Sequence, residues 1–288
     1  LLWLRPHWRG LQRLEQTARR VGDGDLSSRT GLPPGSSLGR VGLTFDQMTE
    51  QLQAILASRK QLTDAIAHEL RTPLVRLRYR LAMLDPQPSA AEQQGLERDL
   101  GALDALIEEM LTYARLDRPE LPLQCSELEL ASWAGSHLPD WQALRPEKRL
   151  DLVCPTHPLP WRGDPRLLDR ALENLIGNAL RHATSRVTLA MSQQQDHYLL
   201  EVADDGPGID PALAPQIFEP FMRLDQSRDR RTGGAGLGLA IVRSIARHHC
   251  GEVQLLPSAV GARFCLRLPV HLDTNRHQPL TEPPAEQP

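Results

Sequence analysis

Two long apolar stripes, separated by a proline-containing break, constrain the fold of this chain more than any other feature of its sequence. From about residue 47 to residue 84, apolar residues recur at alternating spacings of three and four, the period of one helix face. Residues 85–88 (Asp-Pro-Gln-Pro) end this first helix, because proline cannot continue the hydrogen-bond ladder. Ser89 and Glu92 then form a capping box that starts a second helix. The stripes consist of Leu62, Ile66, Leu70, Leu74, Leu77, Leu81 and Leu84 in the first helix, and of Leu96, Leu100, Leu103, Ile107, Met110 and Ala114 in the second.

The two predicted helices form a hairpin that cannot bury both of its apolar stripes by itself. The short connection makes the helices antiparallel neighbours, and one apolar face is then left open. Pairing of two copies into a four-helix bundle covers this face, because a symmetric dimer presents the same stripe twice. We therefore predict a homodimer.

A shorter pair of apolar repeats precedes the hairpin. Residues 11–21 and 38–52 carry apolar residues at heptad spacing, and a connector rich in Gly, Pro and Ser lies between them. Two helices this short do not bury their stripes alone, so a parallel bundle across a dimer is expected. With Pro6 near its start and Asp-Gly-Asp-Leu at residues 23–26, the segment resembles a HAMP linker. It departs from that family at residues 36–39 (Ser-Ser-Leu-Gly), where an acidic pair is usual.

The first residues indicate a membrane nearby. The chain opens with Leu-Leu-Trp-Leu, and Arg5, Arg9 and Arg13 follow. An apolar end, a tryptophan at the interface and arginines just beyond it are typical of the cytoplasmic exit of a membrane helix. An arbitrary chain boundary explains the same residues equally well. We expect a transmembrane helix of a bacterial inner membrane before Leu1, and a cytoplasmic location for the residues that follow.

After residue 118 the pattern changes to short alternating segments mixed with helices, which predicts a second domain of α/β type. Beyond Val270 the chain is polar and rich in proline, so a disordered tail is expected. The net charge of -3 provides no basic field for nucleic acid, and the four cysteines stand too far apart in sequence for a zinc site. Strands are expected at residues 149–154, 186–191, 198–203, 252–256 and 263–268, and helices at residues 165–182 and 237–249.

A candidate reactive centre lies in the first long helix, at residues 67–74 (Ala-His-Glu-Leu-Arg-Thr-Pro-Leu). His68 lies two residues past Ile66, about 200° around the helix axis, so it points away from the apolar stripe. A neutral imidazole can attack phosphorus, and Glu69 can take the proton from its other ring nitrogen. Thr72, one turn on, can hold a water that hydrolyses the phosphoryl adduct. A lone His-Glu pair is more often an ordinary exposed pair, but the whole run on a hairpin favours the reactive interpretation.

The second domain carries four clusters, and the first is an asparagine pair. Asn174 and Asn178 lie one turn apart on one face of the expected helix 165–182. Their carboxamide oxygens suit Mg²⁺, which takes hard oxygen ligands and shares the phosphates of its nucleotide. Arg181 and His182 extend this edge and can reach a phosphate. Asparagines on a helix surface are common, so the pair alone is a weak signal.

The other three clusters suit the remaining parts of a nucleotide. Asp204 follows the expected strand 198–203, and a carboxylate at a strand end can accept a hydrogen bond from an adenine amino group. Residues 218–223 (Phe-Glu-Pro-Phe-Met-Arg) add aromatic anchors and a cation. Residues 233–241 are rich in glycine and open a helix, where free amides and the helix dipole bind anions. Core packing explains the two phenylalanines as well as nucleotide binding does. A flexible loop explains the glycines equally well. The candidate residues are Asp204, Gly206, Gly208, Arg223, Gly234, Gly236, Leu237 and Gly238, and the arginines between residues 223 and 231 predict a mobile lid over a triphosphate.

Taken in this order, the clusters resemble the ATP-binding domain shared by histidine kinases, gyrase-type ATPases and related chaperones. Residues 67–74 resemble the phosphoacceptor box of bacterial sensor histidine kinases, and the resemblance to that family extends over about residues 1–270. Residues 68–80 and 111–118 are especially similar to the RstB group of the family. The resemblance implies that Asn174 and Asn178 hold Mg²⁺, that Asp204 contacts adenine and that Arg223 contacts the terminal phosphate. It also implies a cradle formed by the glycines and a response regulator of the RstA type as partner. Arg181 and His182 stand where Lys and Tyr are common.

The predicted architecture is a multidomain chain: a dimeric all-α helical hairpin, forming a four-helix bundle with a HAMP linker, followed by an α/β sandwich that binds ATP. Its expected function is to phosphorylate His68 with Mg-ATP, to pass the phosphoryl group to an Asp of a response regulator and, through Thr72, to dephosphorylate that regulator. An ATPase or chaperone-like switch would use the same nucleotide fold without needing His68. The expected boundaries are residues 1–56 for the membrane-helix end and HAMP linker, 57–118 for the hairpin, 119–270 for the ATP-binding domain and 271–288 for the tail.

Overall fold

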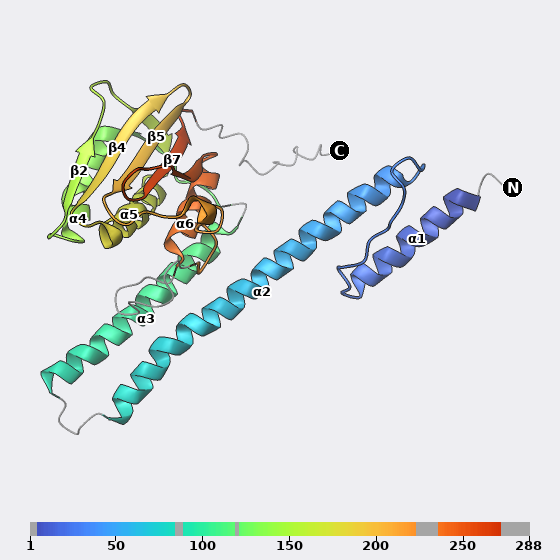
Figure 1. Cartoon of the computed structure of the whole chain (residues 1–288), viewed down its shortest axis with the longest axis horizontal. Helices are drawn as coiled ribbons and strands as arrows, with labels where there is room; N and C mark the ends of the chain where they lie inside the picture. Colours follow the sequence, from blue (N-terminus) through green and yellow to red (C-terminus); the bar gives the residue numbers. More distant parts are fainter. Residues whose placement is uncertain (1–4, 84–88, 119–120, 223–235, 272–288) are drawn as a thin grey trace, which may run out of the picture. The chain divides into compact units, whose positions relative to one another are not determined.

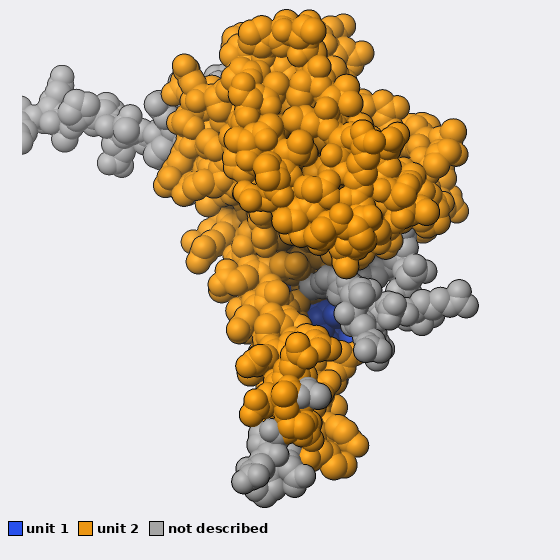
Figure 2. All heavy atoms as spheres, turned by 90° about the vertical axis from the view of Figure 1, so that its left-hand side faces the viewer, with its two compact units in different colours: residues 1–72 blue, residues 73–288 orange. Residues whose placement is uncertain are grey.

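The computed structural model describes residues 5–83, 89–118, 121–222 and 236–271 (Figure 1). The chain divides into two compact units, residues 1–72 and residues 73–288, which are coloured separately in Figure 2. The boundary falls inside one helix, between Thr72 and Pro73. Among the described residues, no helix combines the length and the apolar content that crossing a membrane requires.

The first unit contains helix α1 (Arg5–Gly22), a connector and most of helix α2 (Gly39–Ala82). The connector is fixed to α2 through one carboxylate, because the amide and hydroxyl of Thr30 donate to the two oxygens of Asp46 at 2.8 and 2.9 Å. Helix α2 is 44 residues long and has no interruption between the predicted linker repeat and the predicted hairpin. The two patterns seen in the sequence therefore belong to one continuous helix.

The apolar stripes of the hairpin and the linker are incompletely covered in a single chain. In both units, large apolar side chains on α1, α2 and α3 remain exposed to solvent. Such exposure is expected of an apolar surface that a second copy of the chain covers. The exposed residues are Trp8, Leu11, Val41, Leu43, Met48, Leu52, Ile55 and Leu56 in the first unit, and Leu74, Val75, Tyr79, Leu81, Met83, Leu100, Ile107 and Leu111 in the second.

The second unit begins with the end of α2 and the antiparallel helix α3 (Ala90–Leu116). The predicted capping box is confirmed: the Ser89 hydroxyl accepts the Glu92 amide, and the Glu92 carboxylate accepts the Ser89 amide at 2.8 Å. Arg80 of α2 reaches Asp99 of α3 at 2.6 Å, passing over Gly95, where a side chain would collide with the guanidinium. This ion pair links the end of α2 to α3.

The rest of the second unit is an α/β sandwich, as predicted. Its sheet has the order β2-β4-β5-β7-β6, in which only β2 and β4 are parallel. Helices α4, α5 and α6 pack on the sheet and form a second layer (Figure 1). The elements are β1 (Ser126–Glu129), α4 (Leu130–Ala143), β2 (Arg149–Val153), β3 (Pro160–Gly163), α5 (Pro165–His182), β4 (Arg186–Gln194), β5 (His197–Asp204), a 3₁₀ turn (Pro211–Leu213), α6 (Gly238–His248), β6 (Glu252–Leu256) and β7 (Arg263–Pro269).

All five strands and both helices predicted for this domain are confirmed. The sequence did not predict α4 or the small antiparallel pair formed by β1 and β3. The predicted tail, apart from His271, and the opening residues 1–4 lie outside the described residues.

Within the second unit, α3 is attached to the sandwich through a buried histidine. The imidazole of His248, at the end of α6, donates from Nε2 to the carbonyl of Leu116 at 2.8 Å, and both residues are buried. A carbonyl in the last turn of a helix has no partner within that helix. The hydrogen bond therefore satisfies the end of α3 and joins it to α6.

A single carboxylate organises the start of α4. Glu129 accepts hydrogen bonds from the amides of Ala131 and Ser132, in the first turn of α4, and from the amide of Leu159 at 2.9 Å. Burial disfavours the charged form, but these hydrogen bonds outweigh it and lower the pKa of Glu129 to about 2. The same side chain thus caps α4 and holds the segment that leads into β3.

The Glu129→Gln substitution should lower the free energy of unfolding by about 1–2 kcal/mol at neutral pH, because an amide cannot accept all three hydrogen bonds. The pKa of Glu129 is lower in the folded chain than in the unfolded chain, so its contribution is complete above about pH 4.5 and is lost as the pH falls toward 2. Urea unfolding of both forms, followed by tryptophan fluorescence, should show a difference that shrinks as the pH falls below about 5. A difference independent of pH contradicts this account.

Candidate functional site

The candidate phosphoacceptor segment lies in α2, within the first unit. His68 is exposed, whereas Ile66 and Leu70 are half-buried, so the predicted outward orientation of the imidazole is confirmed. Glu69 is half-buried beside it. The Thr72 hydroxyl is 3.5 Å from the carbonyl of His68, which is too long for a strong hydrogen bond. The hydroxyl is therefore left available for another partner on the turn that carries His68.

The side-chain amide of Asn174 has a defined orientation in α5. Its nitrogen Nδ2 donates to the carbonyl of Arg170 at 2.8 Å, so its oxygen Oδ1 is directed away from the helix backbone. Oδ1 lies 2.8 Å from the point where a side chain of Gly238 would begin. The carboxamide oxygen of Asn174 therefore meets the first turn of α6, and a larger residue at position 238 would require this oxygen to move.

The rest of the predicted helix face continues along α5. Asn178 is half-buried one turn beyond Asn174, and Arg181 and His182 are exposed in the last turn. The carbonyl of His182 lies directly against Gly206, where a side chain would collide with it. The end of α5 and the turn after β5 are thus in backbone contact, which brings the first and second predicted clusters together.

The two neighbouring aspartates at the end of β5 have different roles. Asp204 is buried, and its Oδ1 accepts the amides of Gly206 at 2.9 Å and Ala262 at 3.2 Å. Its second oxygen, Oδ2, has no hydrogen-bond partner among the described residues. Asp205 instead turns back to the start of β4, where the hydroxyl and amide of Ser185 hold its pKa well below the usual range. Of the two aspartates, only Asp204 keeps an oxygen available for a ligand.

Gly261 packs against the candidate site, although no motif in the sequence marks it. Gly208 has φ +78° and lies close to the carbonyl of Gly261, which has φ +66° and is packed against the backbone of Asp204. Both positions need glycine, because the left-handed region is strained for other residues. A Gly-Ala pair directly before a strand was the only available signal, and such pairs are common.

The start of α6 has the features of an anion site. The residue before its first turn, Leu237, is buried and provides no side-chain cap, so the first amides of α6 have no side-chain acceptor there. Gly236 has φ +76°, and its carbonyl accepts the amide of Phe221 at 2.9 Å. Free amides and the helix dipole favour a negatively charged group at this end. Arg223, Gly234 and the predicted lid lie outside the described residues.

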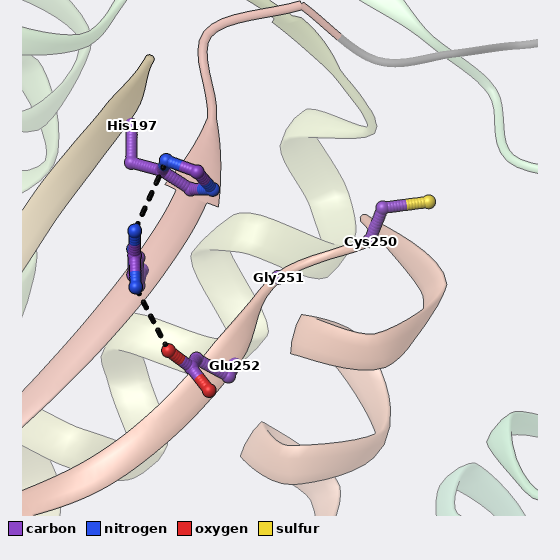
Figure 3. A pocket seen from close by; sticks show the side chains of 5 residues that line it. His197, Cys250, Gly251 and Glu252 are labelled. Carbon is purple, nitrogen blue, oxygen red and sulfur yellow. Dashed lines mark hydrogen bonds and ion pairs between the residues drawn. The ribbon is translucent and has the colours of Figure 1, made fainter. Parts of the chain in front are cut away.

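A small hollow at the other end of β5 does not suit the same ligand. It is lined by His197, Cys250, Gly251, Glu252 and Arg267, and Figure 3 shows the Cys250 thiol directed away from His197. The guanidinium of Arg267 is already engaged, by Glu252 at 3.2 Å and by His197 at 3.3 Å. The described residues contain no group of three or more His, Cys, Asp and Glu side chains placed to hold a metal ion.

Three protein families match consecutive parts of the chain. Residues 4–54 match the HAMP domain, residues 58–119 the His kinase A (phosphoacceptor) domain, and residues 163–272 the histidine kinase-, DNA gyrase B- and HSP90-like ATPases. A phosphoacceptor hairpin followed by an ATPase domain of this kind defines a histidine kinase, and the chain belongs to the sensor histidine kinases.

Comparison with individual proteins places the chain more closely within this family. It is 51% identical to the sensor protein RstB of Escherichia coli K12 over 93% of this chain and 62% of that protein. It is 34% identical to the sensor histidine kinase CpxA of the same strain over 94% of this chain and 60% of that protein. The chain is thus an RstB-like sensor histidine kinase that spans less than two thirds of the length of these relatives.

Solved structures support the fold independently. The histidine kinase AdeS of Acinetobacter baumannii superposes with a TM-score of 0.59 at 23% identity, covering 70% of this chain and 98% of that one. The histidine kinase ThkA, solved in complex with the response regulator protein TrrA, gives a TM-score of 0.63 at 20% identity and covers 77% of this chain and 65% of that one. At these identities the likeness shows the fold alone.

The Gly238→Ala substitution should weaken nucleotide binding about tenfold or more, because the added methyl group must displace the carboxamide oxygen of Asn174. Titration of the chain with Mg-ATP in a calorimeter measures this loss. Gly135→Ala is the matched control, since it adds the same methyl group at an exposed position of helix α4, with no atom within 4 Å. Equal affinities for Gly238→Ala and the wild type would show that the contact between α5 and α6 does not shape the site.

Proposed function

We propose that the chain is the catalytic part of a sensor histidine kinase that phosphorylates itself on His68 with Mg-ATP and passes the phosphoryl group to an Asp of a response regulator. The observation that carries the proposal is the contact between the Asn174 carboxamide oxygen and Gly238 at the start of α6. It places a hard oxygen ligand beside a set of free helix amides, in a chain that also carries an exposed histidine on a phosphoacceptor helix.

In the proposed site, the nucleotide lies between α5, α6 and the end of β5. The free oxygen of Asp204 accepts a hydrogen bond from the adenine amino group, and Gly206 and Gly208 let the backbone lie close to the ring. The amides of Leu237 and Gly238, at the start of α6, donate to the phosphates. By family resemblance, Arg223 contacts the terminal phosphate and Gly236 shapes the cradle, and Gly234 lies in the same glycine-rich run. Arg181 and His182 depart from the family pattern, but they extend the edge of α5 and can reach a phosphate.

The carboxamide oxygens of Asn174 and Asn178 fit Mg²⁺, a cation that takes oxygen ligands, retains waters and neutralises charge on bound phosphates. The fit rests on Asn174, whose Nδ2 is held by a carbonyl and whose Oδ1 is therefore free to act as a ligand. Asn178 lies one turn away on the same face.

His68 supplies the nucleophile in the proposed reaction. A ring nitrogen of the neutral imidazole forms a bond to the γ-phosphorus, the bond to the β,γ-bridging oxygen breaks, and ADP leaves. Glu69, adjacent in sequence, takes the proton of the second ring nitrogen, so the phosphorylated ring is neutral. Exposure of His68 on α2 suits both this attack and later access by an Asp of the partner.

The proposed assembly is a homodimer anchored by a preceding transmembrane helix, with its regulator on the cytoplasmic side. The apolar stripes left exposed on α2 and α3 support the dimer. The relationship to RstB supports a response regulator of the RstA type, and ThkA provides a family example of a complex with a response regulator.

Incubation with γ-labelled ATP and Mg²⁺ tests the central step. The chain should acquire a label that is stable in alkali and lost in acid, as a phosphoramidate is, and His68→Gln should abolish the label while leaving ATP affinity within about twofold of wild type. Labelling of His68→Gln would place the acceptor elsewhere. Release of free phosphate with no labelled protein would favour the ATPase alternative.

Thr72→Ala should separate two activities of the same helix. The Thr72 hydroxyl makes no strong bond in α2, so its loss should leave the fold and the labelling of His68 intact while slowing dephosphorylation of the regulator by about tenfold or more. The measurement follows loss of label from a phosphorylated regulator of the RstA type. Thr63→Ala is the matched control, because Thr63 donates to the carbonyl of Arg59 in the same helix at 3.0 Å. Equal loss of both activities in Thr72→Ala refutes the separation.

A further inference from the structure

Lysine is rare in this chain, and one of its lysines lies beside the nucleotide helix. Of 33 basic side chains, only Lys60 and Lys148 are lysines. Lys60 is exposed on α2. Lys148 is half-buried in the turn that leads into β2, and no motif in the sequence marks it.

The ammonium group of Lys148 closes the end of α5. Its Nζ donates to the carbonyl of Leu180 and to the carbonyl of Ala183, both at 2.7 Å. These carbonyls belong to the last turn of α5 and its C-cap, where backbone acceptors have no partner in the helix. A positive charge at this end also complements the helix dipole, so two short charge-assisted bonds hold the turn.

The backbone of Lys148 is itself fixed by helix α4. The side-chain amide of Gln142 donates to the carbonyl of Lys148 at 2.6 Å, and its oxygen accepts the amide of Leu150 at 2.9 Å. The backbone that carries the Lys148 side chain is therefore held in place by α4 and by the start of β2.

The two carbonyls held by Lys148 flank the part of α5 that meets the nucleotide site. Arg181 and His182 lie between them in sequence, and the carbonyl of His182 packs on Gly206. On the other side of the same turn, Asp205 holds the amides of Thr184 and Ser185 at 2.8 and 2.9 Å. The ammonium group of Lys148 thus binds the carbonyls of this turn, and the carboxylate of Asp205 binds its amides. Asp205 is next to Asp204 in the sequence.

We propose that Lys148 is a positioning residue for ATP: it holds the last turn of α5 against Gly206, and so keeps the Asn174 and Asn178 face of α5 in register with Asp204. This inference rests on the proposed nucleotide site and adds a residue that does not touch the nucleotide. Loss of the ammonium group leaves two helix-end carbonyls without their cation, and the turn is then free to move away from Gly206. Binding weakens as a result, whereas the chemistry at His68 is unchanged once ATP is bound.

The choice of lysine agrees with this role. Two carbonyls converge on a single Nζ, and a compact ammonium with three donors serves both from one point. A guanidinium is planar and presents its donors as a wider fork. Arginine at this position is expected to retain the charge with poorer geometry, which makes it a graded test of the contact.

The test compares Lys148→Met and Lys148→Arg with the wild-type chain in autophosphorylation assays over a range of Mg-ATP concentrations. Lys148→Met should raise KM for ATP about tenfold and leave kcat within about twofold, and Lys148→Arg should recover most of the affinity. Lys60→Met makes the same chemical change on exposed α2 and should behave as wild type. An unchanged KM in folded Lys148→Met, or equal losses of kcat in both Lys148 variants, overturns the proposal.

Asp204→Asn distinguishes failure of this inference from failure of the proposed site. If Asp204→Asn binds Mg-ATP as tightly as wild type does, the proposed site is wrong and the role of Lys148 falls with it. If Asp204→Asn loses binding while Lys148→Met keeps it, only the role of Lys148 is refuted.

A measurement on the wild-type chain covers the case in which Lys148→Met does not fold. An amine-reactive acetylating reagent should modify Lys60 rapidly and Lys148 slowly, and Mg-ATP should slow modification of Lys148 further, by about fivefold or more, because coupling between two sites is reciprocal. Peptide mass spectrometry reports both rates, with Lys60 as the internal control. A Lys148 rate that is unaffected by saturating Mg-ATP contradicts the proposal.

Discussion

Close approach of three backbone segments at the end of strand β5 is the constraint on which the nucleotide site depends. The end of α5, the turn at Gly206 and Gly208, and the turn at Gly261 meet at positions where a side chain would collide with a neighbouring carbonyl. Because the backbone makes these contacts, the shape of the site depends on glycines, which have no side chain to keep the segments apart. Asp204 joins the two turns, because its carboxylate accepts the amides of both Gly206 and Ala262. The position of α5, and with it the asparagine face, follows from this packing.

Much of the fold could be predicted from the sequence, because its main elements have strong internal periods. Strand β5 alternates between buried and half-buried residues along its whole length, and the hairpin stripes keep a helical period over many turns. The elements that were missed have weak local signals. Helix α4 starts at a glutamate cap and contains Pro139, and β1 and β3 have four residues each. Their formation depends on contacts distant in sequence, such as the bond from Leu159 to Glu129, which no local pattern reports.

Candidate site residues that lie in a motif of several residues could be predicted from the sequence. Candidate residues that stand alone in the sequence could not. Asn174, Asp204 and Gly238 lie in recognisable clusters, yet the contact between Asn174 and Gly238 appears only when α5 and α6 are packed together. Gly261 and Lys148 stand alone in the sequence, and each acquires a role only through the carbonyls that surround it. Asp205 shows the converse: it shares a motif with Asp204, but its carboxylate is used entirely by the start of β4.

The uninterrupted course of α2 has a mechanical consequence. From Gly39 to His68 the backbone forms one continuous helix of roughly 44 Å, with no break between the connector and the imidazole of His68. Because no loop interrupts the helix, a rotation of its first turn about the helix axis is carried along the backbone toward His68. The direction in which His68 points is therefore coupled to a contact roughly 33 Å away along α2, where Asp46 accepts hydrogen bonds from Thr30.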